Sequence, residues 1–188
     1  MADKPSYIGL LNAIANGERV GHKIFRNWAK VTTCDDIRGT LQTVAIREAE
    51  HAWAFEKRLC ELGFGLRAKD FPDLKKTLKV VKSNATDLEK FEHLGYGDKA
   101  KRKAQDDGLL KLLADTTIDP QTGALLGRFI CEERDTGRRL KACYQQLKLA
   151  AEKPTAKPMA ETNLDQVCEQ LAMLTEKVDA MTRLKAVR

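Results

Sequence analysis

Residues 47–59 read REAEHAWAFEKRL, and within them Glu48 and His51 stand three positions apart. On an α-helix this spacing projects the carboxylate and the imidazole from one face. Both residues are also in phase with an apolar stripe, which consists of Leu41, Val44, Phe55, Leu59 and Leu62. Burying an ionised carboxylate is costly unless a metal ion or a partner charge compensates it. The stretch therefore predicts a long helix that carries a polar site into a core.

The composition is that of a helical protein with a core. Of the 188 residues, 43% are hydrophobic and 32% are charged, whereas only 6% are aromatic. This balance supports a packed core, and the abundance of Ala, Leu, Lys and Glu favours helices. The net charge is +6, but the one dense basic cluster, residues 99–103, has acidic neighbours and no aromatic residue between its cations for stacking on bases. We therefore do not expect nucleic acid as a partner.

The chain carries neither a membrane signal nor a cysteine framework. Its five cysteines form no CxxC pair and no zinc-ligand spacing, so we interpret them as buried free thiols in a reducing compartment, with Cys60 and Cys131 as core thiols on helices. The first residues, MADKPSYIG, lack the cationic start and apolar run of a signal peptide. No stretch approaches the ~20 apolar residues of a membrane span. We expect a soluble cytoplasmic protein with no membrane partner.

Apolar periodicity divides the first 152 residues into four helical regions. The pattern predicts helices over 7–30, 36–62 and 120–151, and a third region over 86–114 that Gly95, Gly97 and Gly108 interrupt. A connection of some twenty residues, with a short helical piece over 72–81, separates the two helical pairs. Thr33 or Asp35 is the expected cap of the second helix, and Asp119 before Pro120 that of the fourth. The fold class is therefore all-α, an up-down-down-up four-helix bundle with one long crossover.

The two helical pairs repeat one another at a distance of 85 positions. The shift places five residues on equal or similar partners: Ala29 on Ala114, Thr32 on Thr117, Leu41 on Leu126, Val44 on Phe129 and Glu48 on Glu133. Duplication of a helical pair is a stronger signal than any single short motif. It predicts that Glu133 lies in the fourth helix where Glu48 lies in the second.

The last part of the chain has a different pattern. Residues 1–152 form the predicted bundle, and the proline-containing stretch 153–160 reads as a linker. Residues 161–188 follow as a coiled-coil helix whose apolar seam repeats with spacings of three and four: Leu164, Val167, Leu171, Leu174, Val178 and Met181. A seam of this length needs a second helix, either from its own bundle or from another chain. We favour self-association and expect a homo-oligomer, with a dimer as the favoured form.

Taken together, these residues resemble the ferritin-like superfamily, and specifically its rubrerythrin-like branch. The resemblance covers residues 7–150 and implies a bundle in which carboxylates and histidines hold two iron or manganese ions. By this likeness Glu18, Glu48, His51 and Glu133 are metal ligands, with Glu132 as the alternative to Glu133. The implied function is that of a metal-binding protein of oxidoreductase or stress-related type, with a di-iron or di-manganese centre as the form that the family offers. No catalytic residue is assigned, and whether the chain is an enzyme stays open.

The second half of the pattern departs from the family. His51 shifted by 85 falls on Thr136, and Glu18 falls on Lys103. Asp135 could coordinate in place of the missing histidine if Glu132 is the inward residue. In one interpretation the bundle keeps a metal site, with one ion or two. In the other, Lys103 pairs with the carboxylates, and the chain is a metal-free bundle that acts as a scaffold or assembly module through its tail.

Two further groups belong near this pattern. His22 lies four residues after Glu18, and we interpret it as a core histidine or as a hydrogen-bond partner of a ligand. The third helical region offers Glu89, Glu92 and His93, which could reach the site only if residues 95–108 form a loop.

Overall fold

The computed structural model describes residues 5–97 and 112–152. All regular structure in these two ranges is helical, and no strand occurs there, so the predicted all-α class is confirmed for the described part. The chain divides into a compact unit of residues 1–149 and a second unit of residues 150–188. The predicted linker 153–160 and coiled-coil tail 161–188 lie outside the described residues, and both stay predictions.

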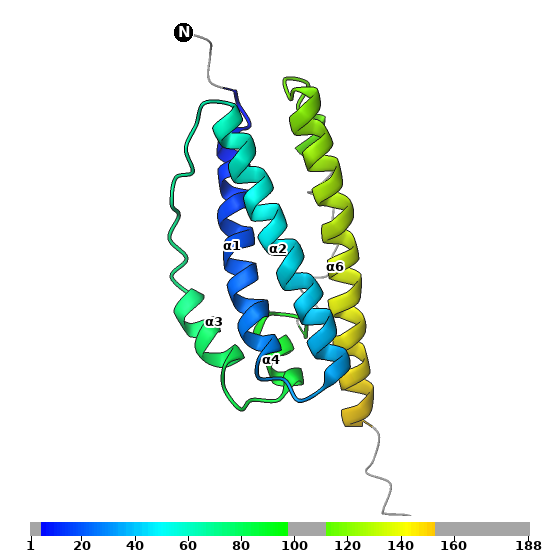
Figure 1. Ribbon diagram of the computed structural model, residues 1–188. Coiled ribbons are helices and arrows are strands. Elements are labelled where there is room, and N and C mark those ends of the chain that lie inside the picture. Colours follow the sequence, from blue (N-terminus) through cyan, green and yellow to red (C-terminus); the bar gives the residue numbers. More distant parts are fainter. Residues whose placement is uncertain (1–4, 98–111, 153–188) are drawn as a thin grey trace, which may run out of the picture. The chain divides into compact units, whose positions relative to one another are not determined.

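Three long helices make up most of the first unit. They are α1 (Ile8–Ala29), α2 (Asp35–Glu61) and α6 (Pro120–Glu152). Each begins and ends within one residue of the range that the apolar periodicity predicts. In Figure 1, α1 and α2 run antiparallel as a hairpin, and α6 runs beside α2 in the direction of α1.

The third helical region differs from the prediction of one element over 86–114. The structure has a short helix α4 (Asp87–His93), and η2, a turn of 3₁₀ helix, at Leu112–Ala114. Helix α4 ends because Gly95 takes a φ of 87°, which lets the amide of Tyr96 reach the carbonyl of Phe91 at 3.1 Å. Residues 98–111 lie outside the described part. The four-helix up-down-down-up arrangement therefore stays a prediction.

The ends of the long helices follow simple chemistry, with one exception. Gly63, at a φ of 82°, closes α2 by donating its amide to the carbonyl of Cys60 at 2.9 Å. Asp119 caps α6, because its carboxylate accepts the amide of Thr122 at 3.0 Å. The expected cap of α2 by Thr33 or Asp35 is wrong. Cys34 precedes the helix without a side-chain cap, and Asp35 lies in the first turn, where it pairs with Arg38.

The long crossover is held against α1 by asparagine side chains. Asn12 and Asn16 each donate to the carbonyl of Arg67 at 3.0 Å, and the amide of Arg67 returns a hydrogen bond to Asn12 at 2.7 Å. The short helix α3 (Leu74–Val81) follows, where the sequence predicts a helical piece. Further along, Asp87 at the start of α4 accepts hydrogen bonds from Trp28 and Thr32. These contacts tie the second half of the connection to the end of α1.

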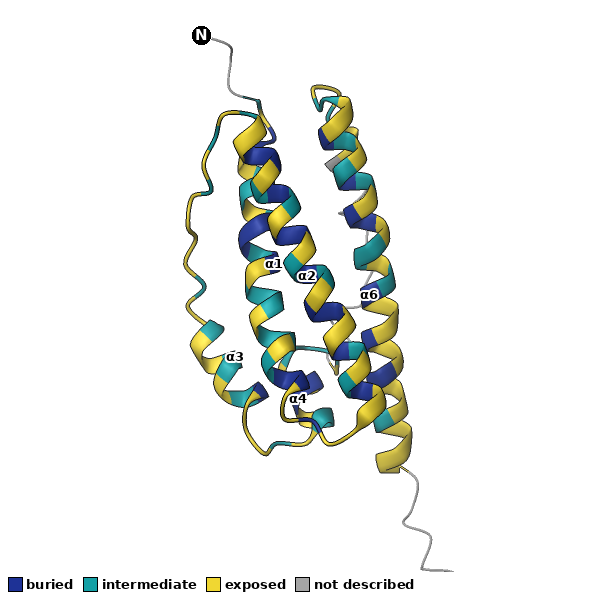
Figure 2. Cartoon of the chain, in the orientation of Figure 1, coloured by how far each residue is buried: buried dark blue, intermediate teal, exposed yellow. Residues whose placement is uncertain are grey.

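Two clusters of buried apolar residues lie between the long helices. Figure 2 marks buried residues in dark blue along these helices. We call one the Phe55 core; it contains Tyr7, Ile8, Leu11, Ala15, Phe55, Leu59, Leu126, Phe129 and Ile130. The other is the Trp28 core; it contains Trp28, Ala29, Ile37, Leu41, Val44, Val81, Phe91, Leu140, Cys143 and Tyr144. On each of the three long helices, buried polar residues lie between the part that joins the Phe55 core and the part that joins the Trp28 core. The apolar interior is thus interrupted by a polar layer.

The cysteines are only partly as expected. Cys34, Cys60, Cys131 and Cys143 are free thiols, but only Cys143 is buried. The prediction of core thiols at Cys60 and Cys131 is wrong, because both side chains lie on exposed faces of α2 and α6. An apolar neighbourhood in sequence did not fix the face from which these two side chains project.

Among the helices of the described residues, none combines the length and the apolar character that crossing a bilayer requires.

Asp119 joins three segments, so its charge should support the fold. It accepts hydrogen bonds from Thr122, from Tyr7 at 2.7 Å and from Arg58 at 2.8 Å. The bonds from Thr122, together with those from Tyr7 and Arg58, hold the pKa of Asp119 well below its ordinary value. A depressed pKa contributes stability above the unfolded-state pKa, and this stability is lost as the pH falls.

We therefore expect the free energy of unfolding to fall as the pH drops below about 4, and Asp119→Asn to flatten that dependence. At neutral pH the variant should lose about 1 kcal/mol, because Arg58 loses its charged acceptor, whereas the asparagine oxygen can still cap the helix. Urea melts over a pH series measure both effects. Asp70→Asn, at an exposed position, is the control, and an unchanged pH profile in Asp119→Asn would contradict the assignment.

Candidate metal centre

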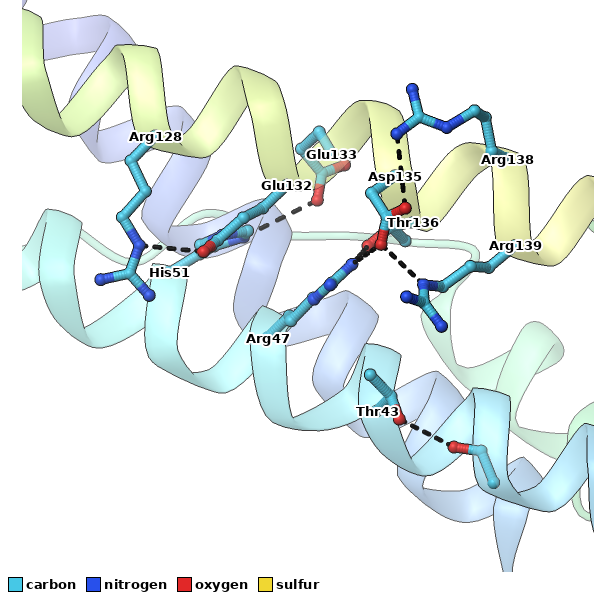
Figure 3. Close-up of polar contacts among 11 residues, drawn as sticks. Thr43, Arg47, His51, Arg128, Glu132, Glu133, Asp135, Thr136, Arg138 and Arg139 are labelled. Carbon is cyan, nitrogen blue, oxygen red and sulfur yellow. Dashed lines mark hydrogen bonds and ion pairs between the residues drawn. The ribbon is translucent and has the colours of Figure 1, made fainter.

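Five ionisable side chains from three helices meet in the polar layer between the two cores. Glu18 comes from α1, Glu48 and His51 from α2, and Glu132 and Glu133 from α6. Ligand atoms of Glu18, His51 and Glu133 all lie within 4.8 Å of one another. The structure therefore brings together the four residues that the sequence singles out, and Glu132, the alternative to Glu133, lies beside His51. Figure 3 shows His51 with Glu132 and Glu133.

His51 is the centre of this cluster. Its Nδ1 lies 3.0 Å from Glu18 Oε2 and 3.7 Å from Glu133 Oε1, whereas its Nε2 lies 2.6 Å from Glu132 Oε2. Burial alone lowers the pKa of His51, but hydrogen bonding to Glu18 and Glu132 and the charges of Glu18 and Glu133 raise it above its ordinary value. The ring is thus held by carboxylates on both of its nitrogens.

The two nitrogens of His51 face different surroundings, and this separates the roles of Glu132 and Glu133. Nδ1 points toward the Glu18 and Glu133 oxygens, where a cation would lie. Nε2 points toward Glu132, which can accept its proton. Histidines that bind a metal usually donate their other ring N–H to a carboxylate, which fixes the tautomer. Of the two alternatives for the inward residue, the geometry favours Glu133 as ligand and Glu132 as the acceptor that orients the ring.

Glu48 is buried against the backbone of α1. A Cβ atom added at Gly21 would lie 2.0 Å from Glu48 Oε2, so the carboxylate occupies the space that any other residue at position 21 would fill. Burial, and then the charges of Glu18 and Glu133, raise the pKa of Glu48 to about 9. A glycine one turn after Glu18 is what allows two carboxylates from different helices to approach.

One carboxylate oxygen of Glu133 pairs with His51 Nδ1 only at 3.7 Å, which is beyond hydrogen-bond distance. This oxygen, Oε1, is buried and has no hydrogen bond within the described part of the chain. Burial and the charge of Glu18 raise the pKa of Glu133 to about 7, against the opposing effect of His51 and Arg47. Buried polar atoms are almost always satisfied, so an orphaned carboxylate oxygen facing other carboxylates needs an explanation. A cation between Glu18, His51 and Glu133 would supply the missing partner.

The donor set fits a hard or borderline divalent ion. Carboxylate oxygens with one imidazole suit manganese or iron, whereas thiolates, which softer ions prefer, are absent from the cluster. Four carboxylates around one histidine also leave a net negative charge in a half-buried space. The residues present therefore fit a metal ion in both donor chemistry and charge.

The other candidates from the sequence lie elsewhere. His22 places Nδ1 2.7 Å from the carbonyl oxygen of Ala45, outside the cluster. Asp135 pairs with arginines and does not take a ligand position. Glu89 forms the capping box of α4 with Thr86, and His93 lies on that helix 3.4 Å from the hydroxyl of Thr77. Lys103 lies outside the described residues, so its pairing with the carboxylates stays a prediction.

Three neighbours of the cluster were not anticipated from the sequence. Arg47 reaches from α2 to α6, and Arg128 donates to Glu132 Oε1 at 2.9 Å from one helical turn away. Tyr96 follows α4, and burial together with the charges of Glu48 and Glu133 raises its pKa to about 12. The i, i+4 spacing of Arg128 and Glu132 is a signal that could have been found. Nothing in the local sequence places Tyr96 near residues so distant in the chain.

Comparison of the chain with family models, with curated proteins and with solved structures gave no match. The assignment of the site therefore depends on the geometry of these residues.

The close contact between Gly21 and Glu48 can be tested with an alanine at position 21, and Gly17 on the same helix offers a matched control. Gly21→Ala should displace the Glu48 carboxylate, because the new methyl group takes its position, whereas nothing lies within 4 Å of a Cβ at Gly17 on the same helix. Both substitutions favour the helix by up to about 1 kcal/mol. We expect Gly17→Ala to keep metal affinity and Gly21→Ala to weaken it without loss of the fold. Manganese titration calorimetry and thermal melts measure the two properties, and equal affinities would show that Glu48 is not held by this contact.

Proposed function

We propose that the chain is a non-haem metal protein of the ferritin-like type, which holds iron or manganese in the cluster around His51 and belongs to an oxidoreductase or stress-related class. The observation that carries the proposal is the buried Oε1 of Glu133, which has no hydrogen-bond partner among the described residues and lies beside Glu18 and His51. A cluster that served only as a buried ion-pair network would satisfy its own oxygens.

The free-energy cost of burying these charged side chains also supports the metal proposal. Glu48 is 7% exposed and His51 3%, and each projects between the two apolar cores. Apolar residues of similar size at such positions are often as stable as a buried ion network, or more stable. Carboxylates retained in this layer indicate a role other than stability, and metal binding is the role that their donor atoms fit.

The residues of the chain would divide the work between holding the ion and orienting its ligands. Glu18, Glu48 and Glu133 supply negative charge, and Glu132 keeps a proton on His51 Nε2 so that Nδ1 is free to bind. The Glu48 carboxyl carries a proton at neutral pH when no cation is near, and binding displaces it. When bound, iron or manganese would supply one-electron redox chemistry and a coordination position for oxygen or peroxide.

A second candidate function, assembly, has its own observation. On α2, Trp53 is 75% exposed and Ile46 60% exposed, although both are large and apolar. They line one open groove of about 960 Å³, whose rim includes Arg19, Lys23 and Arg128. None of the five cluster residues lines this groove. Adjacent exposed apolar residues of this size indicate a contact surface, and we propose that it contributes to a homo-oligomer together with the coiled-coil tail.

Glu48→Gln tests the metal proposal because it keeps the shape of the side chain and removes its charge. We expect wild-type protein, expressed with ample iron and manganese and purified without chelators, to retain metal, and the variant to lose it. Bound metal should raise the wild-type melting temperature by mass action. At neutral pH the metal-free variant should be about as stable as metal-free wild type, because Glu48 is already protonated there and a glutamine amide likewise carries no charge.

Elemental analysis and calorimetry are the measurements, and Glu50→Ala, at an exposed position on the same helix, is the control. Wild-type protein with iron, manganese and zinc all near zero would reject the metal proposal and leave the metal-free bundle.

The assembly candidate makes a separate prediction. Trp53→Lys places another cation in a basic groove and should weaken self-association, as should deletion of residues 159–188. Sedimentation velocity at equal protein concentrations is the measurement. Leu149→Lys, at a residue of α6 that is 60% exposed, is the control for a general effect of surface charge. Unchanged oligomers in both variants would exclude the two surfaces as the source of assembly.

A further inference from the structure

The internal repeat draws attention to Thr136, which stands where the second copy would carry the counterpart of His51. Thr136 is buried at 4% exposure on α6. Its Oγ1 accepts a weak hydrogen bond from Arg47 Nη1 at 3.4 Å, and the same nitrogen lies 2.7 Å from Asp135 Oδ2. Figure 3 shows Arg47 extending from α2 toward these two residues. The guanidinium of Arg47 therefore lies beside Thr136, the position where the repeat would predict a second histidine.

The position of Arg47 is fixed by its partners. Asp135 also accepts hydrogen bonds from Arg139 at 2.6 Å and from Arg138 at 3.3 Å, so the carboxylate is engaged by three cations. The Arg47 side chain is 23% exposed, and its charge acts on Glu133. A guanidinium stays charged at any physiological pH. A permanent positive charge thus lies beside the second half of the cluster.

We propose that Arg47 takes the place of a second metal ion, so that the cluster holds a single ion per chain at its His51 end. This inference deepens the proposed metal function and depends on it. Arg47 acts here as a positioning and specificity-determining residue, since it contacts Asp135 and Thr136 rather than the bound ion.

Two physical effects exclude a second divalent ion. A fixed cation repels another cation, and the repulsion is larger in a half-buried site than in water because the effective dielectric constant is lower. The donors that the described residues offer near Arg47 are also unsuitable. A threonine hydroxyl is a weak neutral ligand compared with an imidazole, and the oxygens of Asp135 are already used by arginines. The His51 end keeps Glu18 and the open oxygen of Glu133, and so retains the better donors.

The experiment is a titration of metal-free full-length protein with Mn²⁺, followed by calorimetry and by the electron paramagnetic resonance of the bound ion. Wild type should bind one Mn²⁺ per chain with the spectrum of an isolated ion. The double variant Arg47→Ala, Thr136→His removes the cation and adds the imidazole. It should bind two ions with a spin-coupled spectrum. The single variant Thr136→His keeps the Arg47 guanidinium and should therefore still bind one Mn²⁺ per chain.

A second measurement keeps the inference testable if the double variant does not fold. Arg47→Met should tighten the binding of the first Mn²⁺ by about threefold to tenfold, because a repelling charge is removed, whereas Arg47→Lys should stay near wild type. A merely structural Arg47 would weaken binding in both variants. Elevated salt should reduce the difference in Mn²⁺ affinity between Arg47→Met and wild type, because it screens the charge of Arg47.

The outcomes separate this inference from the function on which it depends. Two ions in wild type, or a second ion in Thr136→His with Arg47 intact, would overturn the inference and leave the metal function standing. A folded double variant that still binds one ion, or weaker binding in Arg47→Met, would also overturn it. No Mn²⁺ binding by wild type would overturn the proposed function itself.

Discussion

The central constraint of this protein is the burial of like charges. Glu18, Glu48 and Glu133 approach one another between helices, and among the described residues it is His51 that offers a positive charge within the cluster. The site is at least half-buried, so each carboxylate needs a proton, a cation or a hydrogen-bond donor. The raised pKa of Glu48 and of Glu133 follows from this conflict, and so does the unsatisfied oxygen of Glu133.

The surrounding structure is organised to hold these charges in place. Gly21 gives the Glu48 carboxylate room against α1, and Glu132 fixes the ring of His51 from the side opposite to the cluster. Arg47 and Arg128, on the two edges of the layer, bring positive charge without entering it. Aromatic contacts complete the support, since Phe129 packs edge-on against His51 with ring centroids 5.1 Å apart. Each of these residues acts on the site through another residue.

The sequence predicted the parts of this arrangement that depend on local periodicity. The long helices have strong apolar stripes, and Glu48 and His51 are in phase with one, so both their burial and their direction could be foreseen. Glu18 and Glu133 came from the family likeness and the repeat, and the structure brings both to His51. The extent of the third helical region was wrong in its described part, because Gly95 ends α4 in a left-handed turn.

Other features of the site and the fold depend on contacts between segments that are distant in sequence. Such contacts cannot be predicted from one sequence alone. Arg47 adjoins Glu48 in sequence, yet its role follows from Asp135 and Thr136 on another helix. Cys60 and Cys131 have apolar neighbours, but the exact rotation of each helix turns their thiols outward. Whether a family pattern keeps two metal positions or one is decided by such contacts.

The separation of the Phe55 core from the Trp28 core has a consequence for how the molecule opens. Apolar packing is what makes unfolding cooperative, and here it is interrupted by a layer whose groups repel one another when no cation is present. We therefore expect the two ends to open as separate cooperative units, although the same three helices pass through both. A bound ion, with ligands from α1, α2 and α6, would join these units into one. Backbone amides far from the polar layer would then exchange their hydrogens more slowly. Binding of one ion at a small polar site would thus stabilise the three helices along their full length.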